Sequence, residues 1–321
     1  MQQPKKTQEK MQIQQQQIEI EKPQTHKHFS DYFTMFLDQT PFLGRIDEAP
    51  QYIIDNVYIL TGYRINFHSS YMILKSLFMI HNETLNIWTH LIGCIIAIAM
   101  CVDIALYDPY PGRELSKWPI FMFVISGMCC FGFSSCYHLF FVKNPYIAKI
   151  LLRLDYAGIT FLICGSTFPL TYYGFYCQQA FQWFYLSLIF GIGMVVFTIT
   201  MMDFIYAEKY RHIKSLIYAF YGAFCGLSII QLLIQEHLQG QNPNLPCTSS
   251  TLFYYVTMGF VDYTGLYIYA LRQPEKNFPG KFDICGHSHQ IMHVSNMVGM
   301  LVTYQATLIH YQQRIEYGCP V

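Results

Sequence analysis

Apolar runs of about twenty residues, separated by short polar breaks, constrain this chain more than any other feature of its sequence. A transmembrane helix must cover roughly 30 Å of hydrocarbon and satisfy its backbone hydrogen bonds internally, which takes about twenty apolar residues. Seven such runs can be drawn, at about residues 86–107, 118–141, 149–173, 181–201, 212–235, 251–271 and 286–310. The pattern predicts an all-α membrane protein with seven transmembrane helices.

The scarcity of charge agrees with this prediction. Charged residues make up 12% of the chain, about half of the roughly 25% that is usual in soluble proteins. The formal net charge is zero, so binding to nucleic acid has no electrostatic support and is not expected. The eleven cysteines include no CxxC pair, and most lie inside apolar runs, which argues against a zinc ribbon or a disulfide framework.

The segments outside the apolar runs give the expected domain organisation. Residues 1–45 are rich in Gln and Lys and are expected to form a disordered cytoplasmic tail. Residues 46–85 form a juxtamembrane segment, in which "YMILKSLFMI" (71–80) predicts an interfacial helix that is too short to cross the membrane. The seven-helix domain spans 86–310, and residues 311–321 are expected to form a short outer tail.

The distribution of lysine and arginine predicts the orientation. With seven spans, 17 of the 20 Lys and Arg residues fall on the side of the N-terminus and three on the other side. Loops rich in Lys and Arg stay in the cytoplasm. The sequence therefore predicts a cytoplasmic N-terminus and an extracellular C-terminus, the reverse of G-protein-coupled receptors.

Polar side chains occur where the predicted spans reach the cytoplasmic side. Ser134 and His138 close the second span, Asp155 opens the third, and "HSHQIMH" (287–293) opens the seventh. Ionisable residues within spans are costly and usually mark function. Because these segments end at one depth, we expect their side chains to meet.

The residue types and spacing indicate a metal site. His289 and His293 are four residues apart and share one helix face. Together with His138 they would give three histidine ligands and an open fourth position, the arrangement of catalytic zinc. Asp155 could then handle a proton, and Ser134 could orient water or a carbonyl. The structural alternatives are that His138 binds a backbone carbonyl or lies at the headgroups, and that Ser134 bonds to its own helix. Asp155 could instead cap a helix or pair with Arg153 or a loop lysine.

Other polar residues suit structural roles better. His287 would point away from His289 on a helix, so we expect it at the headgroup boundary rather than among the ligands. Glu83, Asn86 and His90 share one face at the start of the first span; they either support the ligands or, as we expect, hold the helix against its neighbours. Asp262, deep in the sixth span, needs a partner or a water-filled cavity.

Four blocks, "SLFMIHNETLNIWTHLIG", "SSCYHLFF", "RLDYAGI" and "FPGKFDICGHSHQIMHV", occur in an order that resembles the progestin and adipoQ receptor (PAQR) family. This family includes adiponectin receptors and is related to haemolysin III proteins; the resemblance runs from about residue 57 to 310. It implies seven transmembrane helices and a Zn²⁺ ion near the cytoplasmic face. Matched block by block, the ligands fall on His138, His289 and His293, and the nearby family residues fall on Ser134 and Asp155.

Three functions follow from these observations. The first is a ceramidase-like, zinc-dependent hydrolase of lipid amides, which the resemblance implies and in which a ceramide-like lipid is the substrate. The second is a receptor with a structural zinc ion and an extracellular ligand. The third is a haemolysin III-type pore or transporter, which the few acidic residues inside the spans disfavour. The expected location is the plasma membrane, with an internal membrane as the alternative.

Overall fold

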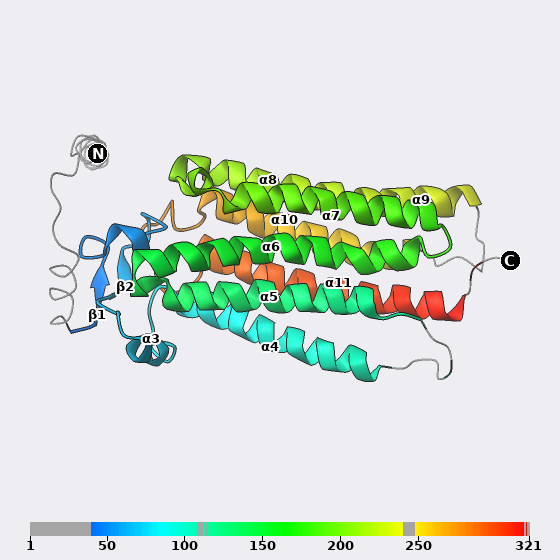
Figure 1. Ribbon diagram of the computed structural model, residues 1–321. Helices are drawn as coiled ribbons and strands as arrows, with labels where there is room; N and C mark the ends of the chain where they lie inside the picture. The colour runs from blue at the N-terminus through cyan, green and yellow to red at the C-terminus, as the bar shows by residue number, and fades with distance from the viewer. Residues whose placement is uncertain (1–39, 108–111, 113–114, 240–247, 318, 320–321) are drawn as a thin grey trace. The chain divides into compact units, whose positions relative to one another are not determined.

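The computed structural model describes residues 40–107, 112, 115–239, 248–317 and 319. The chain from Pro41 onward forms one compact unit, in which long helices lie side by side (Figure 1). Their bounds are α4 Thr84–Leu106, α5 Trp118–Phe140, α6 Pro145–Gly174, α7 Gln179–Met201, α8 Arg211–Cys225, α9 Leu227–Gln239, α10 Ser249–Leu271 and α11 Ser288–Glu316. The predicted tail up to residue 39 lies outside the described residues.

Each predicted apolar run coincides with one long helix, except the fifth. That run is divided at Gly226 into α8 and α9. Helix α11 continues to Glu316, so part of the outer tail expected at residues 311–321 is helical. Residues 42–45, which the sequence places in the disordered tail, instead form a β-strand.

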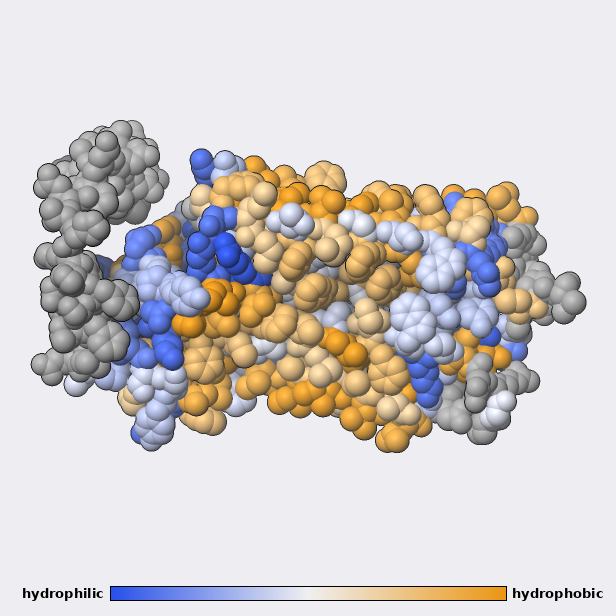
Figure 2. Space-filling view, viewed as in Figure 1, coloured by the Kyte–Doolittle hydropathy of each residue, from blue (hydrophilic) through white to orange (hydrophobic). Residues whose placement is uncertain are grey.

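On the face shown in Figure 2, apolar side chains cover the bundle between its two polar ends. On α4, for example, Ile95 and Val102 are 56% and 54% exposed, a cost in water that lipid removes. Among the described residues, four segments are both long and apolar enough to cross a membrane: α4, α5, α7 and the combined α8–α9. Helices α6, α10 and α11 are as long but carry more polar side chains.

Glycines let α5 and α6 approach closely. A Cβ atom at Gly158 would lie 2.7 Å from the Cα of Cys130, and one at Gly165 would lie 2.2 Å from Ser126 Oγ. Contacts this short are open only to glycine, and small residues serve the same purpose in other membrane helix pairs. The close packing brings the first turns of α6 against the last turns of α5.

A small folded cap covers the end of the bundle at which α5 ends and α11 begins. We define the cap as residues 41–83 and 272–287. It contains an antiparallel hairpin of β1 (Phe42–Arg45) and β2 (Thr61–Ile65), the short helix α3 (Ser70–Ser76) and the 3-10 turn η1 (Gln51–Ile53). Three further 3-10 turns in the chain are η2 (Phe141–Lys143), η3 (Asp203–Tyr206) and η4 (Glu208–Tyr210).

Arg64 joins the cap to the bundle, and Asp283 and Glu275 join the two segments of the cap to each other. Arg64 of β2 is 2% exposed and donates to the carbonyl oxygens of His138 (2.6 Å) and Leu139 (3.0 Å) at the end of α5. Asp283 accepts from the backbone N–H of Leu60 at 3.0 Å. Glu275 accepts from Asn56 at 3.0 Å. The cap thus fixes the helix ends that carry the predicted metal ligands.

The predicted interfacial helix is shorter than expected, since α3 ends at Ser76. Its outer side and the following turn are apolar: Tyr71 is 65% exposed, Leu74 50% and Phe78 80%. Such a surface suits the boundary between lipid and water.

The opposite end of the bundle carries a disulfide bond. Cys177, between α6 and α7, is bonded to Cys319, beyond the end of α11. Beside it, the buried Arg314 donates to the carbonyl oxygen of Tyr173 at 3.1 Å, a favourable place for a cation at the end of α6. The absence of a CxxC pair gave no indication of this bond, because its partners are 142 residues apart.

Candidate metal centre

Three predicted ligands meet at the capped end of the bundle. Nitrogen atoms of His138, His289 and His293 all lie within 4.8 Å of one another. The ring centroids of each pair are 4.7–5.0 Å apart, and the ring planes are inclined by 72–85°. Helix α5 contributes His138 from its last turn, and α11 contributes the other two from its first two turns. The three histidines form a cluster that could hold a metal ion.

Hydrogen bonds at Nδ1 set the orientation of two of these rings. Nδ1 of His138 lies 2.8 Å from Oε2 of Glu83, and Nδ1 of His293 lies 3.2 Å from the carbonyl oxygen of Asn86. Each ring can therefore donate its Nδ1–H to an acceptor and keep Nε2 as an acceptor. Nε2 of His138 is buried and has no hydrogen-bond partner among the described residues. A buried nitrogen without a partner fits a metal ligand.

Glu83 and Asn86 therefore touch the ligands as well as packing α4 against its neighbours. The third member of this set, His90, stacks on His293 with ring centroids 3.5 Å apart. The expectation of a purely interhelical role for this face was incomplete. Its spacing along α4 was visible in the sequence, but its contacts depend on how α4 packs against α5 and α11.

The start of α11 is set by the cap. Glu275 accepts hydrogen bonds from the backbone N–H of Ser288, at 2.9 Å, and from its hydroxyl. A carboxylate at a helix N-terminus satisfies free N–H groups and interacts favourably with the helix dipole. These hydrogen bonds hold Ser288, the first residue of α11, directly before His289. Sequence reasoning did not find Glu275, because it lies in a loop 13 residues away.

His287 differs from its predicted position. It precedes α11 as the N-cap residue and is only 5% exposed, rather than at the headgroups. Its Nε2 lies 3.4 Å from the carbonyl oxygen of Asn82. Burial lowers the pKa of His287 below its usual value. It is not among the three clustered histidines, because its ring contacts the cap at Asn82.

Asp155 and Ser134 lie beside the cluster. Asn144 caps α6 by accepting from the N–H of Ile147 at 2.9 Å, which places Asp155 inside the helix rather than at its cap. Arg153 pairs with Asp203 instead. The Ser134 hydroxyl lies near the Asp155 carboxylate without a hydrogen bond of good geometry to any described residue. Two of the structural alternatives for Asp155 are therefore excluded.

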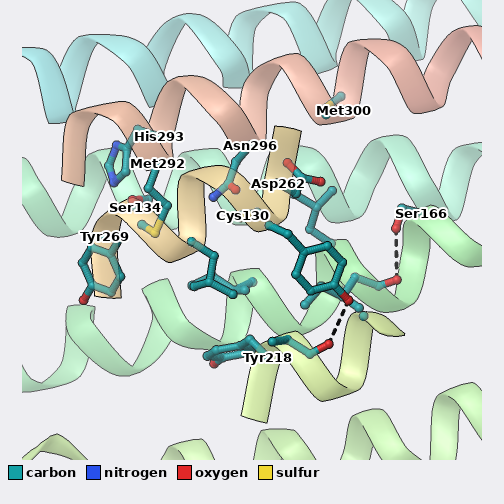
Figure 3. A pocket seen from close by; sticks show the side chains of 18 of the residues that line it. Cys130, Ser134, Ser166, Tyr218, Asp262, Tyr269, Met292, His293, Asn296 and Met300 are labelled. Carbon is teal, nitrogen blue, oxygen red and sulfur yellow. Dashed lines mark hydrogen bonds between the residues drawn. The ribbon is translucent and has the colours of Figure 1, made fainter. Parts of the chain in front are cut away.

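A cavity of about 390 Å³ extends from the histidines into the bundle. Its lining is mostly apolar and comes from helices α4, α5, α6, α8, α9, α10 and α11. Figure 3 shows His293 and Ser134 toward one end and Asp262 and Met300 farther along. The volume lies in the range of small-molecule sites, and the lining suits a lipid chain.

These features define a class: a membrane-embedded helical bundle with a buried histidine cluster at the mouth of an apolar cavity. The model of the haemolysin-III related family matches residues 78–304. Heptahelical transmembrane protein 1 of Arabidopsis thaliana is 36% identical over 280 residues, which cover 85% of this chain and 82% of that protein. The adiponectin receptor protein of Drosophila melanogaster is 31% identical over 269 residues, 84% of this chain and 60% of that protein.

The progestin and adipoQ receptor-like protein 1 of Caenorhabditis elegans is 29% identical over 278 residues, which cover 86% of this chain and 63% of that protein. The chain spans less than two thirds of the fly and worm relatives. It belongs to the haemolysin-III related family and, within it, to the progestin and adipoQ receptor proteins. The resemblance of the four sequence blocks is thereby confirmed, as is an integral, multi-pass membrane protein.

Proposed function

We propose that this protein is a zinc-dependent hydrolase of lipid amides whose metal centre faces the cytoplasm. The observation that carries the proposal is the position of the histidine cluster at one end of the apolar cavity. Structural zinc sites are closed by four protein ligands, whereas catalytic sites keep one position open. Among the described residues the cluster has three histidines and adjoins a space that a substrate can enter.

The side chains present suit hydrolysis. His138, His289 and His293 would hold the ion through ring nitrogens, which zinc accepts readily. A bound zinc ion supplies Lewis acidity and a nucleophile at neutral pH. The carboxylate of Asp155 can accept a proton and return it to the leaving nitrogen. The Ser134 hydroxyl can donate a hydrogen bond to the amide carbonyl.

The cavity supports a lipid substrate. Its walls are mostly apolar, so an acyl chain gains free energy by leaving water. Ser134 and Asp155 line the cavity beside the histidines, where the amide of a ceramide-like lipid would lie. Hydrolysis there would release a fatty acid and an amine.

Two independent observations support the proposed orientation. The count of Lys and Arg predicts a cytoplasmic N-terminus for seven crossings, with α8 and α9 as one span. The bond between Cys177 and Cys319 lies at the end opposite the cap, and disulfides persist in oxidising compartments. A C-terminal fusion to a reporter enzyme that folds only in an oxidising compartment should be active. Activity of the same reporter at the N-terminus alone would contradict the orientation.

A receptor role is the second candidate, and it is favoured by the name of the fly relative, an adiponectin receptor protein. In this case the zinc ion stabilises the fold, and an extracellular ligand acts from the disulfide-bonded end. The plasma membrane and the membranes of the secretory pathway both provide the required orientation. Microscopy of the tagged protein distinguishes them.

Metal analysis and lipid hydrolysis test the proposal together. The purified wild type should contain about one zinc ion per chain, and His293→Ala much less. Asp155→Asn should retain the metal but release fatty acid from ceramide at least about 100-fold more slowly, whereas the surface control Asp203→Asn should match the wild type. A zinc-loaded wild type that releases no fatty acid from any ceramide would favour the receptor. Less than one metal ion per wild-type chain would contradict the proposed metal centre.

A further inference from the structure

A carboxylate at the far part of the cavity has no role in the proposed metal chemistry. Four carboxylates line the cavity: Asp55, Glu83, Asp155 and Asp262. The first three interact electrostatically with histidines of the cluster. Asp262 belongs to the middle of α10, and its Oδ1 atom is shielded from solvent without a hydrogen-bond partner among the described residues. A buried acceptor without a partner costs free energy unless a ligand or water satisfies it.

The bundle makes room for this carboxylate. A Cβ atom at Gly299 of α11 would lie 2.4 Å from Oδ1 and 2.6 Å from Oδ2 of Asp262. Any other residue at position 299 would therefore displace the carboxylate. The absence of a side chain at position 299 thus leaves the space that the Asp262 carboxyl group occupies in the cavity wall. Figure 3 shows Asp262 among the labelled side chains of that wall.

The position of Gly299 gives the depth of Asp262. Gly299 follows His293 by six residues in the same helix, which corresponds to about 9 Å along the axis. Asn296 lies between them and also lines the cavity. An extended acyl chain advances roughly 1.25 Å per carbon–carbon bond, so 9 Å corresponds to about seven or eight bonds.

We propose that Asp262 forms a second polar subsite, which binds a hydroxyl group in the middle of the lipid's acyl chain. The inference rests on the proposed lipid-amide function, because it measures the chain from a carbonyl at the histidine cluster. The hydroxyl, on about the eighth or ninth carbon, donates its hydrogen to a carboxyl oxygen of Asp262. The apolar walls hold the methylene groups on both sides. The subsite thus selects mid-chain hydroxylated lipids over plain ones.

Three lipid amides of one chain length test the subsite. The first is an N-acyl amide with an unsubstituted 18-carbon chain, the second carries a hydroxyl on carbon 9, and the third carries it on carbon 2. Binding to the purified full chain is measured by competition with a fluorescent fatty amide, before and after removal of metal, and hydrolysis is measured alongside. The 9-hydroxy lipid should bind about tenfold more tightly than the other two.

Two variants remove the subsite in different ways. Asp262→Leu deletes the carboxylate, and Gly299→Ala keeps it but occupies its place. Both should reduce the preference for the 9-hydroxy lipid to less than about twofold. Ser166→Ala is the matched control: Ser166 lines the same cavity, but its hydroxyl donates to its own helix, to Ile163 at 3.0 Å. This variant should keep the full preference.

The outcomes separate the subsite from the enzyme. Equal binding of the three lipids to the wild type, or an unchanged preference in Asp262→Leu, would overturn the subsite. A tenfold preference that disappears in Asp262→Leu supports it, even if none of the lipids is hydrolysed. In that last case the proposed hydrolase fails while the lipid subsite stands.

Discussion

At the scale of single residues, Glu83 contacts His138 and would influence how the cluster holds a metal ion. The carboxylate accepts from Nδ1 at 2.8 Å and also accepts from Asn86 at 2.6 Å. Such a partner fixes the ring and makes its other nitrogen more basic. The cluster therefore depends on a residue that contributes no ligand atom.

We expect Glu83→Gln to weaken zinc binding about 10–100-fold, because the amide keeps the shape but loses the charge that polarises His138. Competition with a chelator of known affinity measures the change. The matched control is Glu48→Gln in the exposed loop of the hairpin, where the carboxylate accepts from the backbone N–H of Arg45. Equal zinc affinity of the two variants would show that Glu83 does not act on the metal.

His81 makes the stability of the cap dependent on pH. It is fully buried, with Nε2 3.1 Å from the carbonyl oxygen of Ser76 and Nδ1 accepting from the N–H of Glu83 at 3.1 Å. Desolvation by burial lowers the pKa of His81 from 6.5 to about 3. The folded state therefore keeps the ring neutral while the unfolded state binds a proton below pH 6.5.

Because the unfolded state binds the extra proton, this contribution to stability is complete above pH 6.5. It decreases steadily as the pH falls toward about 3. We expect the melting temperature of the detergent-solubilised wild type to fall between pH 7.5 and pH 5 more than that of His81→Gln. The exposed residue His212 provides the control, since His212→Gln should keep the wild-type slope. Parallel curves for wild type and His81→Gln would contradict the assignment.

At the scale of elements, the sequence predicted helices better than their packing. Uninterrupted apolar runs specify a membrane helix locally, so six of the seven runs match single helices within a few residues. The division at Gly226 was missed because both halves remain apolar. The hairpin of β1 and β2 was also missed, because its strands are four and five residues long and depend on tertiary contacts for stability.

Close packing of α5 and α6 positions Asp155 beside Ser134, and it rests on Gly158. We expect Gly158→Ala to destabilise the bundle by about 1–3 kcal/mol, because its Cβ would meet backbone atoms of Cys130 at 2.7 Å. Gly191→Ala on α7 is the matched substitution, as no described atom lies within 4 Å of its Cβ. It should be neutral or stabilising by up to about 1 kcal/mol. Thermal unfolding in detergent compares the two, and equal melting temperatures would refute the packing argument.

At the scale of the whole molecule, the cap joins segments that the sequence presents as separate. The meeting of His138, His289 and His293 was predictable because each lies in a recognisable block at a span end. Arg64, Asp283 and Glu275 were not, because isolated charged residues in polar segments usually lie in water. Their roles appear only when the hairpin closes over the ends of α5 and α11.

A substitution at Arg64 gives the strongest test of how the cap is attached to α5. Burial lowers its pKa to about 10, so it stays charged at neutral pH while it holds the carbonyl oxygens of His138 and Leu139. We expect Arg64→Lys to lower the melting temperature by roughly 5–10 °C, because a lysine cannot reproduce the planar fork and leaves a buried carbonyl unsatisfied. Arg45→Lys, at a side chain 64% exposed, should change little. An unchanged melting temperature in Arg64→Lys would show that the hydrogen bonds from Arg64 to α5 are dispensable for stability.

The contact between Asn56 and Glu275 has a consequence for biosynthesis. These residues are 219 positions apart, so a ribosome adding about 5–20 residues per second makes the second roughly 10–45 s after the first. During this interval the β1–β2 hairpin lacks the segment 272–287 that it packs against in the cap. His138 is synthesised in the same interval, before His289 and His293. A chain that stops before α11 therefore holds His138 without the other two histidines of the cluster. The three histidines can therefore meet only after translation has passed the first two turns of α11.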